Sequence, residues 1–305
     1  SCNLVPALAK PHTLHQKHIR IHKHLDKKQS TRLYLNSLQP KLKQNRPSQM
    51  IQAPPGSRNV IITGTAKNIS GQIPNMIQNI TEIKKFFDKS TVILLVDQGD
   101  DDGTTQNLQE YTLTHDDTQL LIINNPGKNR EDRLTLARNT LLQESQKYFD
   151  EYQYYLTLDL DMFRVNAETI RPTLDQSKEW DVATANDPNY YYDRWALRTQ
   201  AAKIDCWKNR QCHTPLSRWF PHTDLGQKIP TTQPPLMVDS AFGGLGIYKT
   251  SHLKQCLLHK DCVYSNIGGT PEQPSNDCEH VHFHQKLQEY TGARITIWPA
   301  LTTQH

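Results

Sequence analysis

The sequence lacks any run of 18 consecutive apolar residues, so no segment of its 305 residues has the composition of a membrane-spanning helix. The basic N-terminal segment also lacks the short apolar core of a signal peptide, and the chain contains no internal repeat. Hydrophobic residues make up 36% of the chain, aromatic residues 8% and charged residues 22%. This composition excludes wholesale disorder and favours one large folded domain or two small ones.

Acidic residues are nearly absent from the first 50 positions. That segment carries ten lysines and arginines but only one acid, Asp26, which gives it a net charge of +9. Because the whole chain has a net charge of +4, the remaining residues have a net charge of −5. The cation excess that would indicate a nucleic-acid binder therefore belongs to residues 1–55, which we interpret as a basic, His-rich leader or stem.

Alternating strand and helix patterns begin near residue 58. Short β-branched and apolar runs predict strands at 59–63, 91–96, 120–123, 154–158 and 180–184. Apolar residues at helical spacing predict helices over 73–87 and 131–149. This alternation predicts an α/β fold with a Rossmann-type mixed sheet, mostly parallel and flanked by helices.

Residues 56–305 are expected to form a single catalytic domain. Within it, residues 198–235 contain many Pro, Gln and His residues. This stretch is interpreted as an insertion or an acceptor loop.

The sharpest chemical feature is Leu158-Asp159-Leu160-Asp161, which follows a predicted buried strand. Because side chains alternate along a strand, the two aspartates are expected on one face together with Thr157. Ligands bind beyond the carboxyl ends of the strands in sheets of this kind. Two carboxylates there suit Mn²⁺ or Mg²⁺ holding a diphosphate, and zinc is a poorer match because no Cys or His flanks them.

Polar residues also follow other predicted elements. Asp97 ends a predicted strand, where its carboxylate is placed to accept hydrogen bonds from a base or a ribose. Arg133, Arg138 and Asn139 lie on the helix predicted over 131–149. Arginine side chains in this position suit phosphates or sugar hydroxyls, and surface salt bridges with neighbouring acids are the alternative.

Together these segments resemble GT-A-fold glycosyltransferases that use nucleotide sugars. The resemblance is greatest to the group of fungal capsule-associated and α-1,3-mannosyltransferase-like proteins, which has relatives in large algal viruses. It covers about residues 58–300 and is carried by residues 61–68, 97–98 with 102–104, 133–139, 158–161, 191–198, 239–244 and 278–281.

The resemblance implies roles for the residues in these motifs, to which the residue patterns add. Residues expected to bind the donor are Thr63, Thr65, Asn68, Asp97, Arg133, Arg138, Asn139 and Asp159. Asp159 and Asp161 are expected to bind the metal, and one of His282 and His284, placed on the face of a possible strand, to complete its shell. For the catalytic base we expect Glu279 first and Asp277 second; the alternative is a helix start capped by Asp277.

An aromatic and charged cluster and a late glycine motif are expected to bind the acceptor or the sugar. In Phe242-Gly243-Gly244, the glycines would let the backbone approach a sugar closely beside an aromatic ring, and a tight turn in the core is the alternative. The full expected set is Tyr192, Asp193, Arg194, Trp195, Asp239, Phe242, Gly243 and Gly244.

The expected reaction is metal-dependent transfer of a hexose or pentose from a UDP- or GDP-linked donor to a hydroxyl of a glycan or glycoprotein. A carboxylate base would make the transfer inverting. Two alternatives stay open. One is a sugar-phosphate nucleotidyltransferase, for which residues 63–67 are a poor version of the required Gly-rich loop. The other is a non-catalytic carbohydrate-binding protein that keeps the fold. No nucleic-acid partner is expected.

Five of the six cysteines lie in the second half of the chain. In an oxidising compartment we expect Cys206–Cys212 and either Cys262–Cys278 or Cys256–Cys262 to form disulfides. The leader fits a type II enzyme of the Golgi or secretory lumen cut after its anchor, with membrane contact only through a segment absent from this chain. A cytoplasmic viral or bacterial enzyme is the alternative.

Overall fold

The structure is a computed structural model, and it describes residues 20–21, 56–99, 102–125, 127, 129–202, 204–209, 213–270 and 273–305. The leader expected over 1–55 therefore lies outside the described residues, except for the short strand β1 (Arg20–Ile21). Cys2 and Cys212 also lie outside them, so the expected Cys206–Cys212 pair is not described. No helix of the described ranges is long and apolar enough to cross a membrane.

The N-terminal half of the domain is a run of parallel strands joined by helices. Its strands are β2 (Asn59–Ala66), β3 (Lys89–Asp97), β4 (Thr118–Ile123) and β5 (Tyr154–Asp159). Its helices are α2 (Ile73–Lys84), α3 (Thr104–Leu113) and α4 (Arg130–Ser145). Each predicted strand and helix of this half is present, and the boundaries differ from the prediction by a few residues.

The C-terminal half extends the same sheet. Its strands are β6 (Arg164–Val165), β7 (Val182–Asn186), β8 (Leu236–Val238), β9 (Leu245–Lys249) and β12 (Ile295–Gln304). Its helices are α5 (Ile170–Asp175), α6 (Cys206–Asn209), α7 (Thr250–Cys256) and α8 (Glu279–Thr291). A separate hairpin is formed by β10 (Ile267–Thr270) and β11 (Gln273–Asn276).

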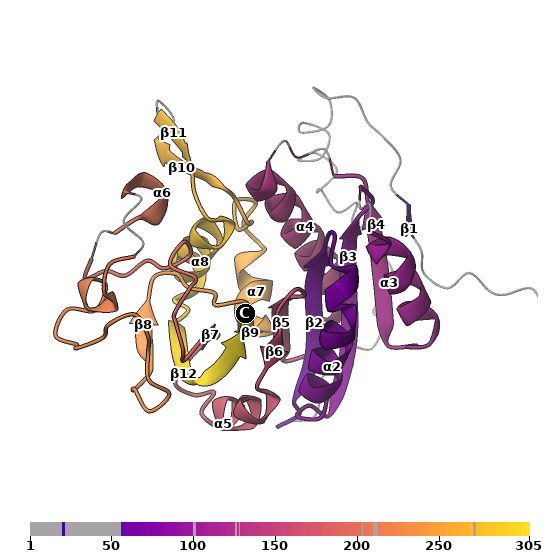
Figure 1. The fold of residues 1–305 in the computed structure, drawn as a ribbon, viewed down its shortest axis with the longest axis horizontal. Helices are drawn as coiled ribbons and strands as arrows, with labels where there is room; N and C mark the ends of the chain where they lie inside the picture. Colours follow the sequence, from indigo (N-terminus) through magenta and orange to yellow (C-terminus); the bar gives the residue numbers. More distant parts are fainter. Residues whose placement is uncertain are drawn as a thin grey trace, which may run out of the picture.

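The main sheet has the strand order β1-β4-β3-β2-β5-β9-β7-β12-β6, with β8 beside β12 (Figure 1). Adjacent strands among β1 to β5 run parallel to one another, and so do β7 and β12. Strand β9 lies antiparallel between β5 and β7, and β6 and β8 pair antiparallel with β12. The predicted α/β fold with a mixed, mostly parallel sheet is therefore confirmed.

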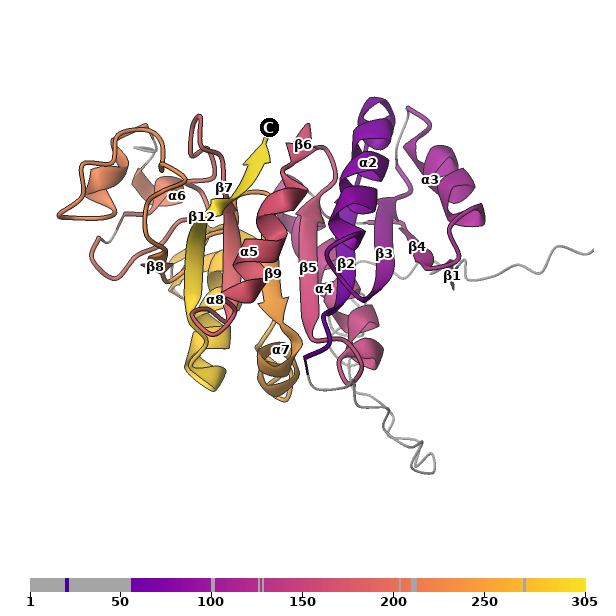
Figure 2. The ribbon, with the colours of Figure 1, turned by 90° about the horizontal axis from the view of Figure 1, so that it is seen from below.

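Helices cover both faces of the sheet, and Figure 2 shows α2 and α5 on one side with α4, α7 and α8 on the other. Apolar residues of α2, α3 and α5 pack in one core cluster with alternate residues of the central strands, such as Ile62 and Leu156. Residues of α4, α7 and α8 pack in a second cluster with the intervening residues, such as Ile61 and Ile93. Because both faces are buried, the central strands are almost continuously apolar, which is why they were predictable.

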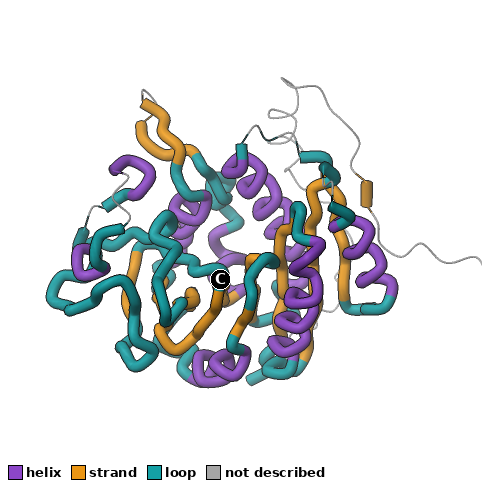
Figure 3. The backbone as a smooth tube through the Cα atoms, in the orientation of Figure 1, coloured by secondary structure: helices purple, strands orange, loops and turns teal. Residues whose placement is uncertain are grey.

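Figure 3 shows that the described residues of the expected insertion at 198–235 are mostly loop, but several of their side chains are buried. They include Leu216, Trp219, Leu225 and Ile229, which belong to the same core cluster as α4 and α8. Trp219 and Ile229 are completely buried. This segment therefore forms part of the domain's core, although its composition is that of a loop.

One disulfide joins Cys256 at the end of α7 to Cys262. Of the two alternatives for Cys262, the pairing with Cys256 is therefore the one present. Cys278 is free and buried, so the Cys262–Cys278 alternative is wrong.

Asp181 links three neighbouring strands of the sheet. It directly precedes β7, and it bonds Lys249 at the end of β9 and Arg294 just before β12. Its carboxylate accepts hydrogen bonds from Lys249 Nζ at 2.9 Å and from the backbone N and Nε of Arg294, both at 3.0 Å. Burial alone would raise the pKa of Asp181, but the hydrogen bonds from Arg294 and Lys249 outweigh it and hold that pKa below its usual range. A group with a lowered pKa stabilises the fold above its unfolded pKa of about 3.9 and loses that contribution as the pH falls.

We therefore expect Asp181→Asn to lower the free energy of unfolding at pH 7 by about 1–3 kcal/mol. The difference from wild type should shrink as the pH falls below about 4. Thermal unfolding between pH 2 and 7 measures this. Asp116→Asn, at an exposed aspartate, is the matched control. A difference that stayed constant across this pH range would contradict the account.

Candidate active site

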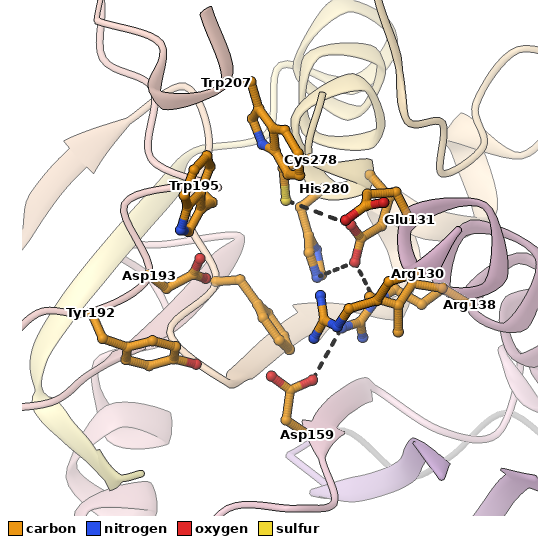
Figure 4. A pocket seen from close by; sticks show the side chains of 13 residues that line it. Arg130, Glu131, Arg138, Asp159, Tyr192, Asp193, Trp195, Trp207, Cys278 and His280 are labelled. Carbon is orange, nitrogen blue, oxygen red and sulfur yellow. Dashed lines mark hydrogen bonds and ion pairs between the residues drawn. The ribbon is translucent and has the colours of Figure 1, made fainter. Parts of the chain in front are cut away.

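A cavity of about 300 Å³ opens at the carboxyl end of β5 (Figure 4). Its walls come from α4, the end of β5, the segment after β7, α6 and the start of α8. The lining residues are Arg130, Glu131, Leu134, Arg138, Asp159, Tyr192, Asp193, Trp195, Trp207, Phe242, Cys278, Glu279 and His280. The sequence-based rule that polar residues gather beyond strand ends therefore locates this cavity.

Arg138 is the buried cation of the cavity, with 4% of its side chain exposed. Its Nε donates to Glu279 Oε1 at 2.8 Å, its Nη2 to Asp159 Oδ1 at 3.1 Å and its Nη1 to Thr157 Oγ1 at 3.3 Å. Burial would lower the pKa of Arg138, but the charges of Glu279 and Asp159 raise it above its usual value. The ring of Phe242 lies 4.8 Å from its guanidinium carbon. Arg138 therefore joins a strand end and a helix start that are distant in sequence.

Asp159 and Thr157 both bond Arg138, as expected for side chains on one face of β5. Asp161 lies beyond the end of the strand and is exposed. Burial and the charge of Asp161 raise the pKa of Asp159, and Arg138 lowers it. The net result is a pKa above the usual value for an aspartate. The two carboxylates are therefore close enough to interact, with Asp159 facing the cavity and Asp161 facing solvent.

His305 was missed by the sequence analysis. It directly follows β12, and a side chain on Gly244 would meet its ring at 2.6 Å, while the carbonyl of Gly244 accepts the backbone N–H of Asp159 at 2.8 Å. Burial lowers the pKa of His305, and the charges of Asp159 and Asp161 oppose this. The strand-end rule would have found His305 if β12 had been predicted.

Several residues expected to bind the donor have other structural roles. Thr63 is buried in the sheet, where its hydroxyl donates to the carbonyl of Leu156 at 3.2 Å. Asn139 bonds both the backbone N and O of Tyr264, at 2.8 and 2.9 Å. Arg133 is half-buried and does not line the cavity. Arg130, one turn earlier on α4, lines it instead.

Other expected donor residues lie at neighbouring strand ends. Thr65 is half-buried near the end of β2, and Asn68 follows β2 with a positive φ of 53°. Asp97 ends β3 and accepts a hydrogen bond from Lys67 Nζ at 2.9 Å. Because β2, β3 and β5 are adjacent and parallel, these residues lie along the same edge of the sheet as Asp159.

The expected strand through His282 and His284 is wrong, because both residues lie on helix α8. His284 is buried, and its ring nitrogens are 3.0 Å from Ser240 Oγ and 2.8 Å from Tyr248 Oη. His282 Nε2 lies 3.1 Å from the carbonyl oxygen of Asp261. Neither histidine lines the cavity with Asp159. The helix-start alternative is correct, although the capping residue is Cys278.

Asp277 and Asp239 line a different cavity, of about 880 Å³. Asp277 is ion-paired with Arg198 at 2.6 Å, so it does not face the same space as Glu279. Arg194 is buried and bonds the carbonyls of Tyr191 and Gln227, at 3.1 and 3.4 Å. It therefore holds loop segments together rather than facing the cavity.

The glycines of the Phe242-Gly243-Gly244 motif have positive φ angles of 68° and 79°. A side chain on Gly243 would lie 2.2 Å from the carbonyl oxygen of Ala185. The motif therefore permits close approach within the protein itself, which is the tight-turn alternative, while Phe242 does line the cavity. Among the other expected acceptor residues, Tyr192, Asp193 and Trp195 also line it.

Trp207 and His280 line the cavity but were not among the expected site residues. Trp207 lies on α6, within the loop-like stretch whose sequence has no helical or strand period. His280 is buried beside Phe242, with ring centroids 4.1 Å apart. The ring nitrogens of His280 and Nε1 of Trp207 are buried without a hydrogen-bond partner in the described part of the chain.

No family model matches this sequence, and no curated protein matches it. Among solved structures, residues 1–349 of TarS from S. aureus are similar, with a TM-score of 0.44 and 17% identity over 81% of this chain and 59% of that one. The mannosyltransferase PcManGT from Pyrobaculum calidifontis, solved in complex with GDP-Man and Mn²⁺, has a TM-score of 0.48 and 17% identity over 90% of this chain and 64% of its own. This chain thus spans less than two thirds of either structure, and similarity at this level assigns no activity.

Proposed function

We propose that this protein is a glycosyltransferase that moves a sugar from a nucleoside-diphosphate donor to a hydroxyl acceptor with the help of Mn²⁺ or Mg²⁺. The observation that carries the proposal is the placement of Asp159 at the carboxyl end of a central parallel strand, within a cavity that also holds Arg138, Asp193 and Glu279. In sheets of this kind the ligand site lies at that edge.

The donor set around Asp159 suits a hard divalent cation. In the described ranges no three His, Cys, Asp or Glu side chains form a ready-made metal cluster. Asp159 and Asp161 follow one another at the end of β5, the charge of Asp161 acts on Asp159, and paired carboxylates match the preferences of Mn²⁺. We propose that these two carboxylates hold the ion and that donor phosphates supply further ligands. When bound, the ion would neutralise charge on the diphosphate leaving group.

The nucleotide is proposed to bind along the neighbouring strand ends. Asp97 is buried at the end of β3, with a carboxylate able to accept hydrogen bonds from a base or ribose. Lys67, ion-paired with Asp97 at 2.9 Å, is a cation at the end of β2. Both lie on the same sheet edge as Asp159, so one extended donor can contact all three.

The sugar and the acceptor are proposed to occupy the cavity. Trp195 and Trp207 form an aromatic wall, with ring centroids 4.8 Å apart, and Trp195 is 42% exposed. Aromatic rings provide an apolar surface for the C–H face of a sugar. Nδ1 of His280 and Nε1 of Trp207, which have no hydrogen-bond partner in the described part of the chain, offer hydrogen-bonding groups for sugar hydroxyls.

A thermal-shift panel with UDP and GDP, each with and without Mn²⁺, tests the proposal, and turnover is followed with the corresponding nucleotide sugars. We expect one nucleoside diphosphate to stabilise the protein only with Mn²⁺, by about 2.7 kcal/mol at 100 times its Kd. No response of the metal-replete protein to either nucleotide would overturn the proposal. A donor that binds but is never hydrolysed or transferred would identify a non-catalytic binding protein.

A further inference from the structure

Only some of the acids that line the cavity are paired with its buried cation. Arg138 forms ion pairs with Asp159 and Glu279. Asp193, by contrast, has no ion-pair partner within the ranges that the structure describes, and Glu131 has none either. Glu131 lies in the first turn of α4, whereas Asp193 faces the cavity from the opposite side to Arg138 (Figure 4). Asp193 is therefore a carboxylate whose charge no neighbouring cation offsets.

Backbone groups fix the orientation of Asp193 without neutralising it. Its Oδ2 accepts the N–H of Gly243 at 2.9 Å, and its Oδ1 accepts the N–H of Ala196 at 3.4 Å. The close carbonyl of Ala185 leaves no room for a side chain at Gly243, so this N–H donor requires glycine at that position. A carboxylate oxygen has two lone pairs, so each oxygen of Asp193 can still accept a proton from a ligand.

Glu279 is less suited to take a proton. Its Oε1 accepts the 2.8 Å hydrogen bond from Arg138, and its Oε2 lies 3.6 Å from the thiol of Cys278. Protonating Glu279 would weaken a buried, charge-assisted pair. Its contacts indicate a role in holding Arg138 in place.

The surroundings of Asp193 also favour proton transfer near neutral pH. Burial and the charges of Asp159 and Glu279 raise the pKa of Asp193, the N–H groups of Gly243 and Ala196 oppose them, and the result is a pKa of about 6. A general base works best when its pKa lies near the operating pH.

We infer that Asp193, rather than Glu279, is the catalytic base, and that the acceptor is a sugar ring lying against Trp195 and Trp207. The inference rests on the proposed glycosyltransferase function. In the step, the acceptor oxygen forms a bond to the anomeric carbon, and its proton passes to a carboxylate oxygen of Asp193. The bond from the anomeric carbon to the diphosphate oxygen breaks, and the nucleoside diphosphate leaves with that electron pair. Direct displacement inverts the anomeric configuration.

The test compares Asp193→Asn with wild type and with Asp116→Asn. Asp116 is a matched control because it is an exposed aspartate that does not line this cavity. The donors are GDP-mannose, UDP-glucose and UDP-N-acetylglucosamine, and the acceptors are methyl mannoside and methyl glucoside. We expect Asp193→Asn to reduce transfer 10²- to 10⁴-fold while the Kd of the nucleoside diphosphate changes less than threefold. Asp116→Asn should keep wild-type transfer.

Azide provides a second measurement, because this anionic nucleophile needs no base. Asp193→Asn should form the glycosyl azide at the wild-type rate while failing with the sugar acceptors. Equal loss with azide and sugars, loss of nucleotide binding, near-normal sugar transfer, or a product of retained configuration would each overturn the role of Asp193. A wild-type protein that neither binds nucleotide nor transfers sugar would instead overturn the proposed function itself.

Discussion

Asp161→Ala is expected to reduce sugar transfer about 10³-fold, because a metal ion at the diphosphate stabilises the transition state by several kcal/mol. Asp161 is exposed beyond the end of β5, and the described residues include no hydrogen bond or ion pair to its side chain. The substitution should therefore leave the free energy of unfolding unchanged. Steady-state turnover at saturating Mn²⁺, together with urea unfolding, measures both quantities.

The Mn²⁺-dependent stabilisation by nucleoside diphosphate should also disappear in Asp161→Ala. Asp116→Ala, at an exposed aspartate remote from the sheet edge, should retain both turnover and stabilisation. Normal nucleotide stabilisation in Asp161→Ala would show that the ion, if one is used, is held elsewhere.

Arg138→Met is expected to lower the free energy of unfolding by about 3–5 kcal/mol. The substitution removes the cation from a site where Glu279 is 6% exposed and Asp159 is 26% exposed. A buried carboxylate without its partner is costly because it has lost both water and the opposite charge. Urea denaturation monitored by circular dichroism gives the change.

The double variant Arg138→Met/Glu279→Leu distinguishes this cause from simple loss of packing. Removing both members of the buried pair leaves only Asp159, which water can reach, so at least half of the lost stability should return. Arg218→Met, at an exposed arginine, should change stability by no more than about 0.5 kcal/mol. A double variant less stable than Arg138→Met would contradict the charge explanation.

Local patterns in the sequence predicted the N-terminal half of the fold well. Strands β2 to β5 are buried on both faces, so they appear as short apolar runs, and α2 and α4 show a helical period. The antiparallel strand β9 was not predicted, because Leu245-Gly-Ile-Tyr-Lys249 is short and contains glycine. Strand β12 was not predicted either; it contains Pro299, which argues against a central strand, and its first residues pair with both β7 and β8.

The candidate site was predictable where it depends on strand ends and not where it depends on distant packing. Asp159 and Arg138 were singled out from local pattern, and both line the cavity. Asp239 and Asp277 carry the same chemical groups, but both line another cavity, where Asp277 is ion-paired with Arg198. The partners of a side chain across 50 or more residues leave no periodic signal in the sequence, so these assignments needed the structure.

The Arg138–Glu279 pair has a consequence for biosynthesis. Its two residues are 141 positions apart, and β12, which follows α8, is the last strand of the main sheet in chain order. A ribosome must therefore release the chain through Glu279 before Arg138 meets its second carboxylate. Until then, strands β2 to β5 can pair with one another. The cavity beside Arg138 and Asp159, however, lacks the wall that the start of α8 provides. Contacts of such long sequence separation form late because closing the intervening loop costs entropy. Chains stalled before α8 would lack the complete site, so activity itself would report synthesis through α8.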